Sequence, residues 1–237
     1  WIDCSWLDSP NEHNLVVSTE SGDVSDLIIG DSKLSTSGVC PGPGQQTACT
    51  GLAMLGVPGG YMYSFEVSRM TYAGSGRALY MLLNANKPRT GSVSNFTAEL
   101  TGNTAAEMFG IWGCDGVTFS NITGTDNNFG MGNQPFLAFH DASNCHVDGY
   151  TAKLLNVGSG CFLALDSPYS SINGFHCYGG GGNLNNTPNR AMGEIGMGAP
   201  GSSDSGFIVS NGTFEMPPGA TNIALRAAVG FNSQDKI

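Results

Sequence analysis

Val93-Ser94-Asn95-Phe96-Thr97 is a five-residue phrase that the chain repeats. Each copy begins with a branched or aromatic apolar residue, continues with a small polar residue, and has Asn or Gly at the third position in five of six cases. The fifth residue is Thr in five of six copies. The other copies are Val67-Ser68-Arg69-Met70-Thr71, Phe119-Ser120-Asn121-Ile122-Thr123, Val147-Asp148-Gly149-Tyr150-Thr151, Ile172-Asn173-Gly174-Phe175-His176 and Val209-Ser210-Asn211-Gly212-Thr213.

The third position of the phrase predicts a bend within a strand. Branched and aromatic residues favour strands, and Asn and Gly tolerate the left-handed backbone that a sharp bend needs. The copies return about every 26 residues, a spacing typical of solenoids whose coils stack on one another. We therefore expect an all-β fold, a single-stranded right-handed parallel β-helix with coils of about 26 residues, in which Asn95 lies beside Asn121 and the threonines form a second column.

Composition agrees with an all-β chain and excludes some partners. The 237 residues include 35 glycines and only 12% charged residues, with a formal net charge of −10. An acidic surface argues against nucleic acid and against an anionic membrane as partners. No apolar stretch reaches the 18 residues that would suggest insertion into a bilayer. The sequence has no starting Met, and we expect a processed product or a fragment of a longer chain.

The first part of the chain is less regular than the rest. We expect residues 1–60 to form irregular coils and a loop, and residues 61–237 to form the regular β-helix, within one continuous domain. Ile29-Gly30-Asp31 reads as an early copy of the bend with Asp at the left-handed position. The loops at 124–135 and 179–188 are rich in Asn and Gly and are expected to rise beside the coils.

Seven cysteines leave at least one without a partner inside the chain. Cys40 and Cys49 bracket a Pro-Gly loop, and a disulfide between them is plausible in an oxidising compartment. Buried free thiols are an equal alternative for the other five. No Cys-x-x-Cys spacing suggests zinc, so no metal and no cofactor is expected.

A second column lies upstream of each bend, in segments that read apolar, small, apolar, variable. Alternation along a strand would turn the two apolar residues inward and the variable residue outward. This alignment predicts an outward column of Trp112, His140, Asp166, Gly198 and Arg226. The segments are Phe109-Gly110-Ile111-Trp112, Leu137-Ala138-Phe139-His140, Leu163-Ala164-Leu165-Asp166, Ile195-Gly196-Met197-Gly198 and Ile223-Ala224-Leu225-Arg226.

The stacked bends and the coil length resemble the right-handed parallel β-helix of the pectate-lyase-like superfamily over residues 61–226. The resemblance implies a carbohydrate-active or carbohydrate-binding protein. The paired-Asp and Gly-His-Gly motifs of polygalacturonases and the Arg-rich groove of pectate lyases are missing. The Gly-, Ser- and Asn-rich, acidic style is most similar to bacteriophage tailspikes. That resemblance implies an extracellular virion-tail protein, a homotrimer that binds and often cuts a bacterial surface polysaccharide during host attachment.

The predicted column supplies groups for sugar chemistry. Trp112, His140 and Arg226 are the candidate substrate-binding residues. Asp141, Asp166 and Glu194, just before the next strand, are the candidate catalytic residues, because glycoside hydrolysis needs two carboxyl groups at about 5–5.5 Å or about 6.5–9.5 Å. The ordinary alternative for the two aspartates is a role in the turn, where Asp binds nearby backbone N–H groups.

Three functions remain open from the sequence. The first is a tailspike-type receptor-binding protein with glycosidase activity. The second is a secreted polysaccharide hydrolase or lyase of the same fold, and the third is a non-catalytic structural or adhesive fibre.

Overall fold

The computed structural model of the chain describes most of the residues that carry the repeats. The described residues are 6–8, 13–20, 22–36, 49–56, 60–83, 90–104, 106–131, 134–156, 160–179, 191–195, 206–216 and 223–227.

Eighteen strands follow one another in the chain order, with no helix among the described residues. They are β1 (Trp6–Asp8), β2 (Leu15–Ser18), β3 (Leu27–Gly30), β4 (Lys33–Thr36), β5 (Thr50–Leu55), β6 (Ser64–Gly74), β7 (Arg77–Leu82), β8 (Thr90–Leu100), β9 (Phe109–Asp115), β10 (Val117–Thr125), β11 (Pro135–Ser143), β12 (His146–Leu154), β13 (Gly160–Leu165), β14 (Ser171–Gly179), β15 (Ala191–Ile195), β16 (Ile208–Ser210), β17 (Thr213–Glu215) and β18 (Ile223–Ala227).

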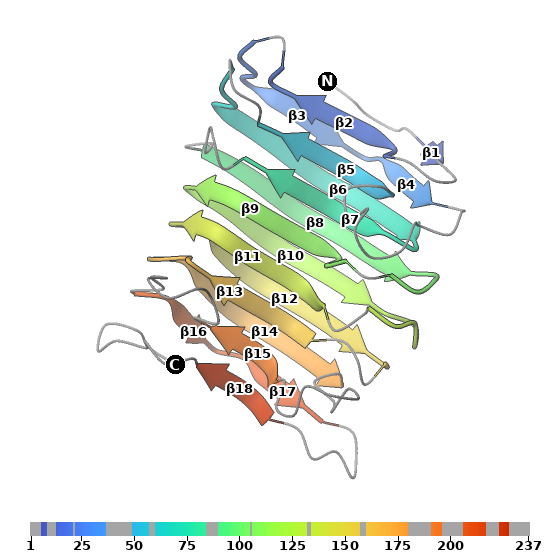
Figure 1. Cartoon of the computed structure of the whole chain (residues 1–237), viewed down its shortest axis with the longest axis vertical. Helices are drawn as coiled ribbons and strands as arrows, with labels where there is room; N and C mark the ends of the chain where they lie inside the picture. The colour runs from blue at the N-terminus through green and yellow to red at the C-terminus, as the bar shows by residue number, and fades with distance from the viewer. Residues whose placement is uncertain are drawn as a thin grey trace.

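The strands form two parallel sheets that run the length of the molecule (Figure 1). The 10-stranded sheet, here sheet A, has the order β1-β4-β6-β8-β10-β12-β14-β16, with β3 beside β6 and β17 beside β14. The 8-stranded sheet, sheet B, has the order β18-β15-β13-β11-β9-β7-β5-β2. From β4 to β16 in sheet A and from β5 to β15 in sheet B, successive strands of one sheet are two strands apart in sequence, so the chain passes from sheet to sheet as it winds. The predicted parallel β-helix is confirmed, with coils about 28 residues apart where the sequence suggested about 26.

No helix in the described ranges is long and apolar enough to cross a membrane. The strands of the first 60 residues join the same sheets, since β2 pairs with β5 in sheet B and β3 and β4 pair with β6 in sheet A.

The bends of sheet A lie in one column, as the phrase predicted. Asn95, Asn121 and Asn211 have φ angles of 53°, 53° and 51°, and Gly149 and Gly174 have φ angles of 73° and 63°. Asp31 also has a positive φ, 49°, and the residues before it pair with the residues before Arg69, which confirms the early copy of the bend. The threonine column is confirmed as well, because Thr123 pairs with Thr97 on one side and with Thr151 on the other.

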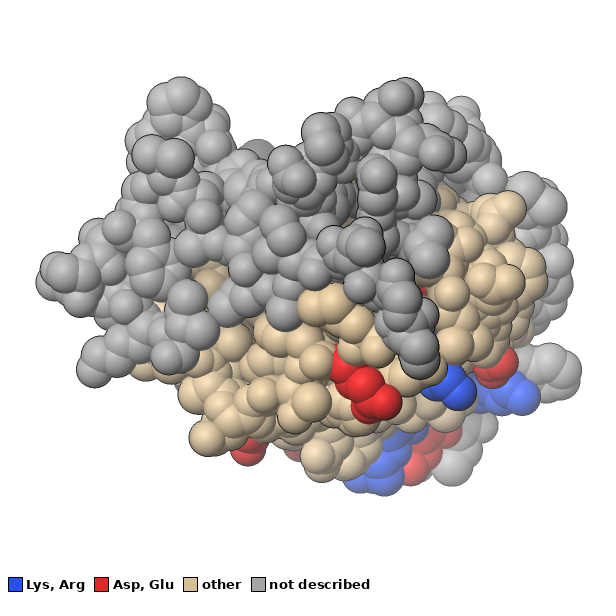
Figure 2. Space-filling view, turned by 90° about the horizontal axis from the view of Figure 1, so that it is seen from below, with Lys and Arg blue, Asp and Glu red and all other residues tan. Residues whose placement is uncertain are grey.

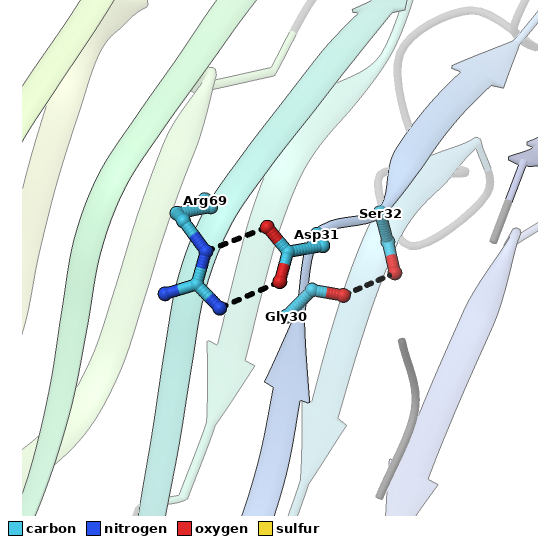
Figure 3. A network of polar contacts seen from close by, with 4 residues as sticks. All are labelled: Gly30, Asp31, Ser32 and Arg69. Atoms are coloured by element: carbon cyan, nitrogen blue, oxygen red, sulfur yellow. Dashed lines mark hydrogen bonds and ion pairs between the residues drawn. The ribbon is translucent and has the colours of Figure 1, made fainter. Parts of the chain in front are cut away.

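Side chains of neighbouring bends are joined by hydrogen bonds. The Asn121 side-chain amide donates to Asn95 Oδ1 at 3.2 Å. At the N-terminal end of the column an ion pair takes the place of the amides (Figure 3): Arg69 Nε and Nη2 donate to the two carboxylate oxygens of Asp31 at 2.6 Å each. An ion pair and an amide pair thus make the same kind of link between two neighbouring coils of the bend column.

Glycine bends move this connection by one residue. Gly149 and Gly174 have no side chain, and the residue before each one carries the bond instead. Asn173 Nδ2 donates to Asp148 Oδ1 at 2.7 Å, and Asn211 Nδ2 donates to Asn173 Oδ1 at 2.8 Å.

The interior between the sheets is apolar and rich in aromatic rings. Phe96 of sheet A contacts Phe109 of sheet B edge-to-face, with ring centroids 5.2 Å apart, and Phe162 and Phe175 do the same at 5.7 Å. All four rings are buried. Bare glycine backbones lie over some of the core rings, and a Cβ on Gly124 would overlap the ring of Phe136.

Two disulfides lie in this core, and the second links β13 of sheet B to β14 of sheet A. Cys114 is bonded to Cys145 and Cys161 is bonded to Cys177, with Cα atoms 6.5 and 6.1 Å apart. The free-thiol alternative is therefore wrong for these four residues. Cys49 is also disulfide-bonded, and the expected partner Cys40 lies outside the described residues.

Asp126 fixes the turn that follows β10. Its side chain is fully buried, and Oδ1 accepts hydrogen bonds from the backbone N–H groups of Asn128 and Leu155 at 2.9 and 2.7 Å. Oδ2 accepts from the N–H of Asn156 at 2.9 Å. One carboxylate thus joins the turns of two neighbouring coils. The second predicted loop lies outside the described residues at 180–190.

Candidate functional site

The outer face of sheet B carries a stacked pair of aromatic rings. Trp112 of β9 and His140 of β11 are paired in register, as the sequence alignment predicted. Their ring centroids are 3.9 Å apart and their planes are inclined by 20°. Leu82 and Leu165 occupy the same register position on the coils to either side. One face of the indole is therefore covered by the imidazole.

The ring nitrogens of this pair are buried and have no hydrogen-bond partner among the described residues. They are Trp112 Nε1 and His140 Nε2. An orphaned buried polar group costs about 1–3 kcal/mol, so each such group in a native protein calls for an explanation. Two of them lie on adjacent stacked rings, which makes this pair the candidate site on sheet B.

A buried ion pair lies on the same face. Arg77, the first residue of β7, donates from Nε and Nη2 to Glu107 Oε2 at 3.2 and 2.6 Å. Both side chains are almost completely buried, at 2% and 8% exposure. The Arg77 guanidinium also lies over the ring of Tyr80, 4.4 Å from its centroid.

Gly110 connects the ion pair to the aromatic pair. It is paired with Tyr80 on one side and Ala138 on the other, two residues before Trp112 along β9. A Cβ at Gly110 would lie 3.4 Å from Arg77 Nε and 3.6 Å from Glu107 Oε2. The bare backbone of Gly110 is thus the floor beneath the ion pair, beside the stacked rings.

Electrostatics also link these groups. Burial lowers the pKa of His140 below its usual 6.5, while the carboxylates of Glu107, Asp141 and Asp166 act in the opposite direction. Arg77 adds to the lowering. His140 is therefore neutral at pH 7, and its Nε2 can donate or accept according to the tautomer.

The structure moves Asp166 out of the predicted outward column. Leu165, not Asp166, pairs with His140. Asp166 follows β13 with φ 51°, and Asp141 has the same φ of 51° within β11. Gly113, which follows Trp112, also has a positive φ, 78°. The two aspartates thus occupy the bend of sheet B on neighbouring coils, a position that fits the turn role. Both also lie close enough to His140 to raise its pKa.

The error came from reading β13 one residue out of register. Leu163-Ala164-Leu165 repeats the apolar, small, apolar order of the coil before it, but Phe162 and Ala164 are buried and Leu163 and Leu165 are partly exposed. A slip of one residue exchanges the two faces of a strand. The observed register puts the larger Phe162 ring into the core, where it packs against Phe175.

The remaining predicted residues lie towards the C-terminal end of the sheet. Glu194 lies within β15, not before it, and its partners in register are Leu163 and Arg226. The predicted alignment of Gly198 with Arg226 is wrong, since Arg226 pairs with Glu194, and Gly198 lies outside the described residues. Glu194 and Arg226 therefore do not share the register position of Trp112 and His140.

Arg77, Tyr80 and Glu107 were missed by the sequence reasoning. One signal was available: Arg77 opens the apolar run Ala78-Leu79-Tyr80-Met81-Leu82, and the whole chain has only nine Lys and Arg residues. A cation at the start of a buried strand usually has a buried partner. Its partner could not be found from the pattern, because Glu107 precedes the next strand of sheet B and belongs to no repeat.

Within the described ranges, no group of three or more His, Cys, Asp or Glu is placed to hold a metal ion. Comparison of the chain with family models, with curated proteins and with solved structures finds no match.

Proposed function

We propose that this protein is an extracellular glycan-binding β-helix that holds polysaccharide on the outer face of sheet B, at Trp112 and His140. The observation that carries the proposal is the stacked pair with its two orphaned ring nitrogens. Sugar hydroxyls suit these groups because each hydroxyl both donates and accepts a hydrogen bond. The indole N–H can only donate a hydrogen bond. The neutral imidazole Nε2 can donate to a sugar hydroxyl or accept from one, according to its tautomer.

Three features of the fold support this proposal. A solenoid repeats the same outward positions once per coil, about 4.8 Å apart, and offers a long polymer a continuous surface. The two disulfides suit an oxidising environment outside the cell. The net charge of −10 disfavours nucleic acid as the polymer.

The proposal extends to the tailspike class that the repeats resemble, a homotrimer that attaches to a bacterial surface polysaccharide as part of a virion tail. Chain cleavage is the further step. Glu107, Asp141 and Asp166 are the carboxyl groups that act on His140. Hydrolysis needs an acid and a second carboxylate near the scissile bond, and Asp141 and Asp166 on neighbouring coils are the pair to test, because Glu107 is buried against Arg77. Farther along the sheet, Glu194 is kept as a candidate catalytic carboxyl group and Arg226 as a candidate sugar contact.

Binding is tested first, with surface polysaccharides of different bacteria and a calorimetric or glycan-array readout. We expect one polysaccharide to bind the wild-type chain and Trp112→Ala to weaken that binding at least tenfold. Tyr63→Ala is the matched control, because Tyr63 is an exposed aromatic residue before β6 of the other sheet. An equal loss of affinity in both variants, or no loss in either, would contradict the binding site at Trp112.

Cleavage is tested separately by the release of reducing ends. If the protein hydrolyses its ligand, Asp141→Asn or Asp166→Asn abolishes release while binding remains. Binding without any release from the wild type would favour the adhesive fibre. Light scattering that shows a monomer would contradict the trimeric assembly but not the glycan site.

A further inference from the structure

The outer face of sheet A carries two columns of hydroxyl groups on three neighbouring coils. A serine precedes each bend of β6, β8 and β10, and a threonine follows it, with each type paired in register from coil to coil. The three threonines are exposed, and the second and third serines are half-buried. The six residues, here called the hydroxyl array, are Ser68, Ser94 and Ser120 in one column and Thr71, Thr97 and Thr123 in the other.

The hydroxyl groups of the array have no hydrogen-bond partner among the described residues. Ser68 ends the serine column and is the buried member, with 3% exposure. Its Oγ lies beside Gly30 of the preceding coil, where a Cβ would be 3.5 Å away. A buried hydroxyl without a partner is costly, so the array calls for hydrogen bonds from outside the described chain.

The bends between the two columns fix the spacing of the array. Asn95 and Asn121 share a φ of 53° and are joined by an amide hydrogen bond of 3.2 Å. Parallel strands lie about 4.8 Å apart, so each column repeats its hydroxyl at that interval. In water joined by tetrahedral O–H···O bonds of about 2.75 Å, oxygens that share a neighbour are about 4.5 Å apart. Over three coils the two intervals differ by about 0.6 Å, little more than the normal spread of O–H···O distances.

Charged side chains lie at the margins of the array and are bound to other groups. Arg69 is bonded to Asp31 at 2.6 Å, and Glu99 Oε1 accepts from Asn127 Nδ2 at 2.6 Å. Asp148 ends the serine column on the next coil. Figure 2, which views the chain from below, likewise shows Lys and Arg beside Asp and Glu, with most of the described atoms in uncharged residues. The array itself is therefore neutral.

We propose that the hydroxyl array binds the surface of ice. Each serine or threonine hydroxyl donates one hydrogen bond and accepts others, as a water molecule of the lattice does. Hydroxyls held at nearly the interval of the lattice replace several of its waters at once, and such simultaneous weak contacts add to one strong attachment. A chain attached in this way blocks growth of the crystal layer beneath it. This activity is separate from the glycan site on sheet B and does not depend on it.

The side chains of this face favour ice over a second glycan site. On β8 and β10 the solvent-facing residues from Ser92 to Glu99 and from Thr118 to Thr125 are Ser, Thr and Asn, apart from Glu99 itself. No aromatic ring faces solvent there, so a sugar ring has no platform on which to stack.

Ice binding is measured on the full chain as thermal hysteresis, the gap between melting and freezing points, and as inhibition of ice recrystallisation. We expect the wild type to show both activities. Thr97→Lys, Thr123→Lys and Ser120→Lys should each lose them, because a long charged side chain within the array keeps the crystal at a distance. Thr101→Lys is the matched control and should keep both, because Thr101 is an exposed threonine directly after β8 and outside the array.

A wild type without hysteresis and without inhibition of recrystallisation overturns the inference. Activity that survives the three array substitutions, or that is lost in Thr101→Lys as well, overturns it too. Incorporation of the fluorescently labelled wild type into a growing ice crystal is a second readout that needs no substitution, and exclusion from the crystal contradicts the inference. Trp112→Ala should leave these activities unchanged while it weakens glycan binding, so the failure of one proposal leaves the other standing.

Discussion

Asn121 donates its side-chain amide to Asn95 Oδ1 at 3.2 Å, and the two residues share a left-handed backbone with φ 53°. They are one step of the column that joins the coils of sheet A. The left-handed conformation and the amide hydrogen bond contribute separately to the free energy of unfolding. Substitutions of Asn121 can measure each contribution.

Asn121→Gly should cost less stability than Asn121→Val. Glycine keeps the left-handed conformation without strain and loses only the amide bond, a loss of about 0.5–1.5 kcal/mol. Valine loses the bond and adds about 1–2 kcal/mol for a side chain forced into the left-handed region. Denaturant unfolding measures both. Thr123→Val is the control in the same strand, and equal costs for Gly and Val at position 121 would contradict the role of the bend.

Removal of Arg77 alone should be more damaging than removal of the whole ion pair. Arg77→Met leaves Glu107 as a buried carboxylate without its guanidinium, which costs about 3–5 kcal/mol. The double substitution Arg77→Met with Glu107→Leu should recover much of that loss, because no charge is left buried. Arg69→Met is the control, since its pair with Asp31 is exposed and should cost less than about 1 kcal/mol. A double variant no more stable than Arg77→Met would contradict this account.

His140 should make the protein less stable as the pH falls below about 6.5. Burial lowers the pKa of His140 in the folded chain, so the unfolded chain takes up the proton first as the pH drops past the usual value of 6.5. The stability contributed by the neutral imidazole is complete above that value and declines towards the lower folded pKa. Unfolding free energies between pH 7.5 and 5 measure the slope.

His140→Asn should flatten that slope, and His146→Asn, at an exposed histidine of sheet A, should leave it as in the wild type. A wild-type slope that survives His140→Asn would show that another group titrates.

Asp126 should contribute more to the free energy of unfolding than a surface aspartate does. Asp126→Ala removes a buried acceptor of three backbone N–H groups from two coils and leaves those donors without it. We expect a loss of at least about 2–3 kcal/mol and faster hydrogen exchange at Leu155 and Asn156. Asp148→Ala, on the exposed side of β12, is the comparison. Unchanged exchange at both amides would contradict the anchoring role.

The parts of the fold that repeat were predictable from the sequence, and the parts that do not repeat were not. The bend column, Asp31 included, followed from the preference of Asn, Asp and Gly for the left-handed region. Trp112 beside His140 followed from two segments with the same apolar order. The predicted register of β13 was wrong because the Leu and Ala residues of this strand fit the apolar pattern equally well when shifted by one residue. Only the packing of Phe162 in the core decides between the two registers. The Arg77–Glu107 pair depends on contacts between coils that leave no periodic mark.

The indole N–H resonance of Trp112 tests the central claim most directly. The chain has three tryptophans, so an ¹⁵N-labelled sample gives three indole signals, and Trp112→Phe identifies the one that matters. On titration with the polysaccharide that the binding screen selects, we predict that the Trp112 signal shifts until saturation and that the signals of Trp1 and Trp6 stay in place. Saturating binding with the Trp112 signal unmoved would contradict the account, because the glycan would then lie elsewhere on the solenoid.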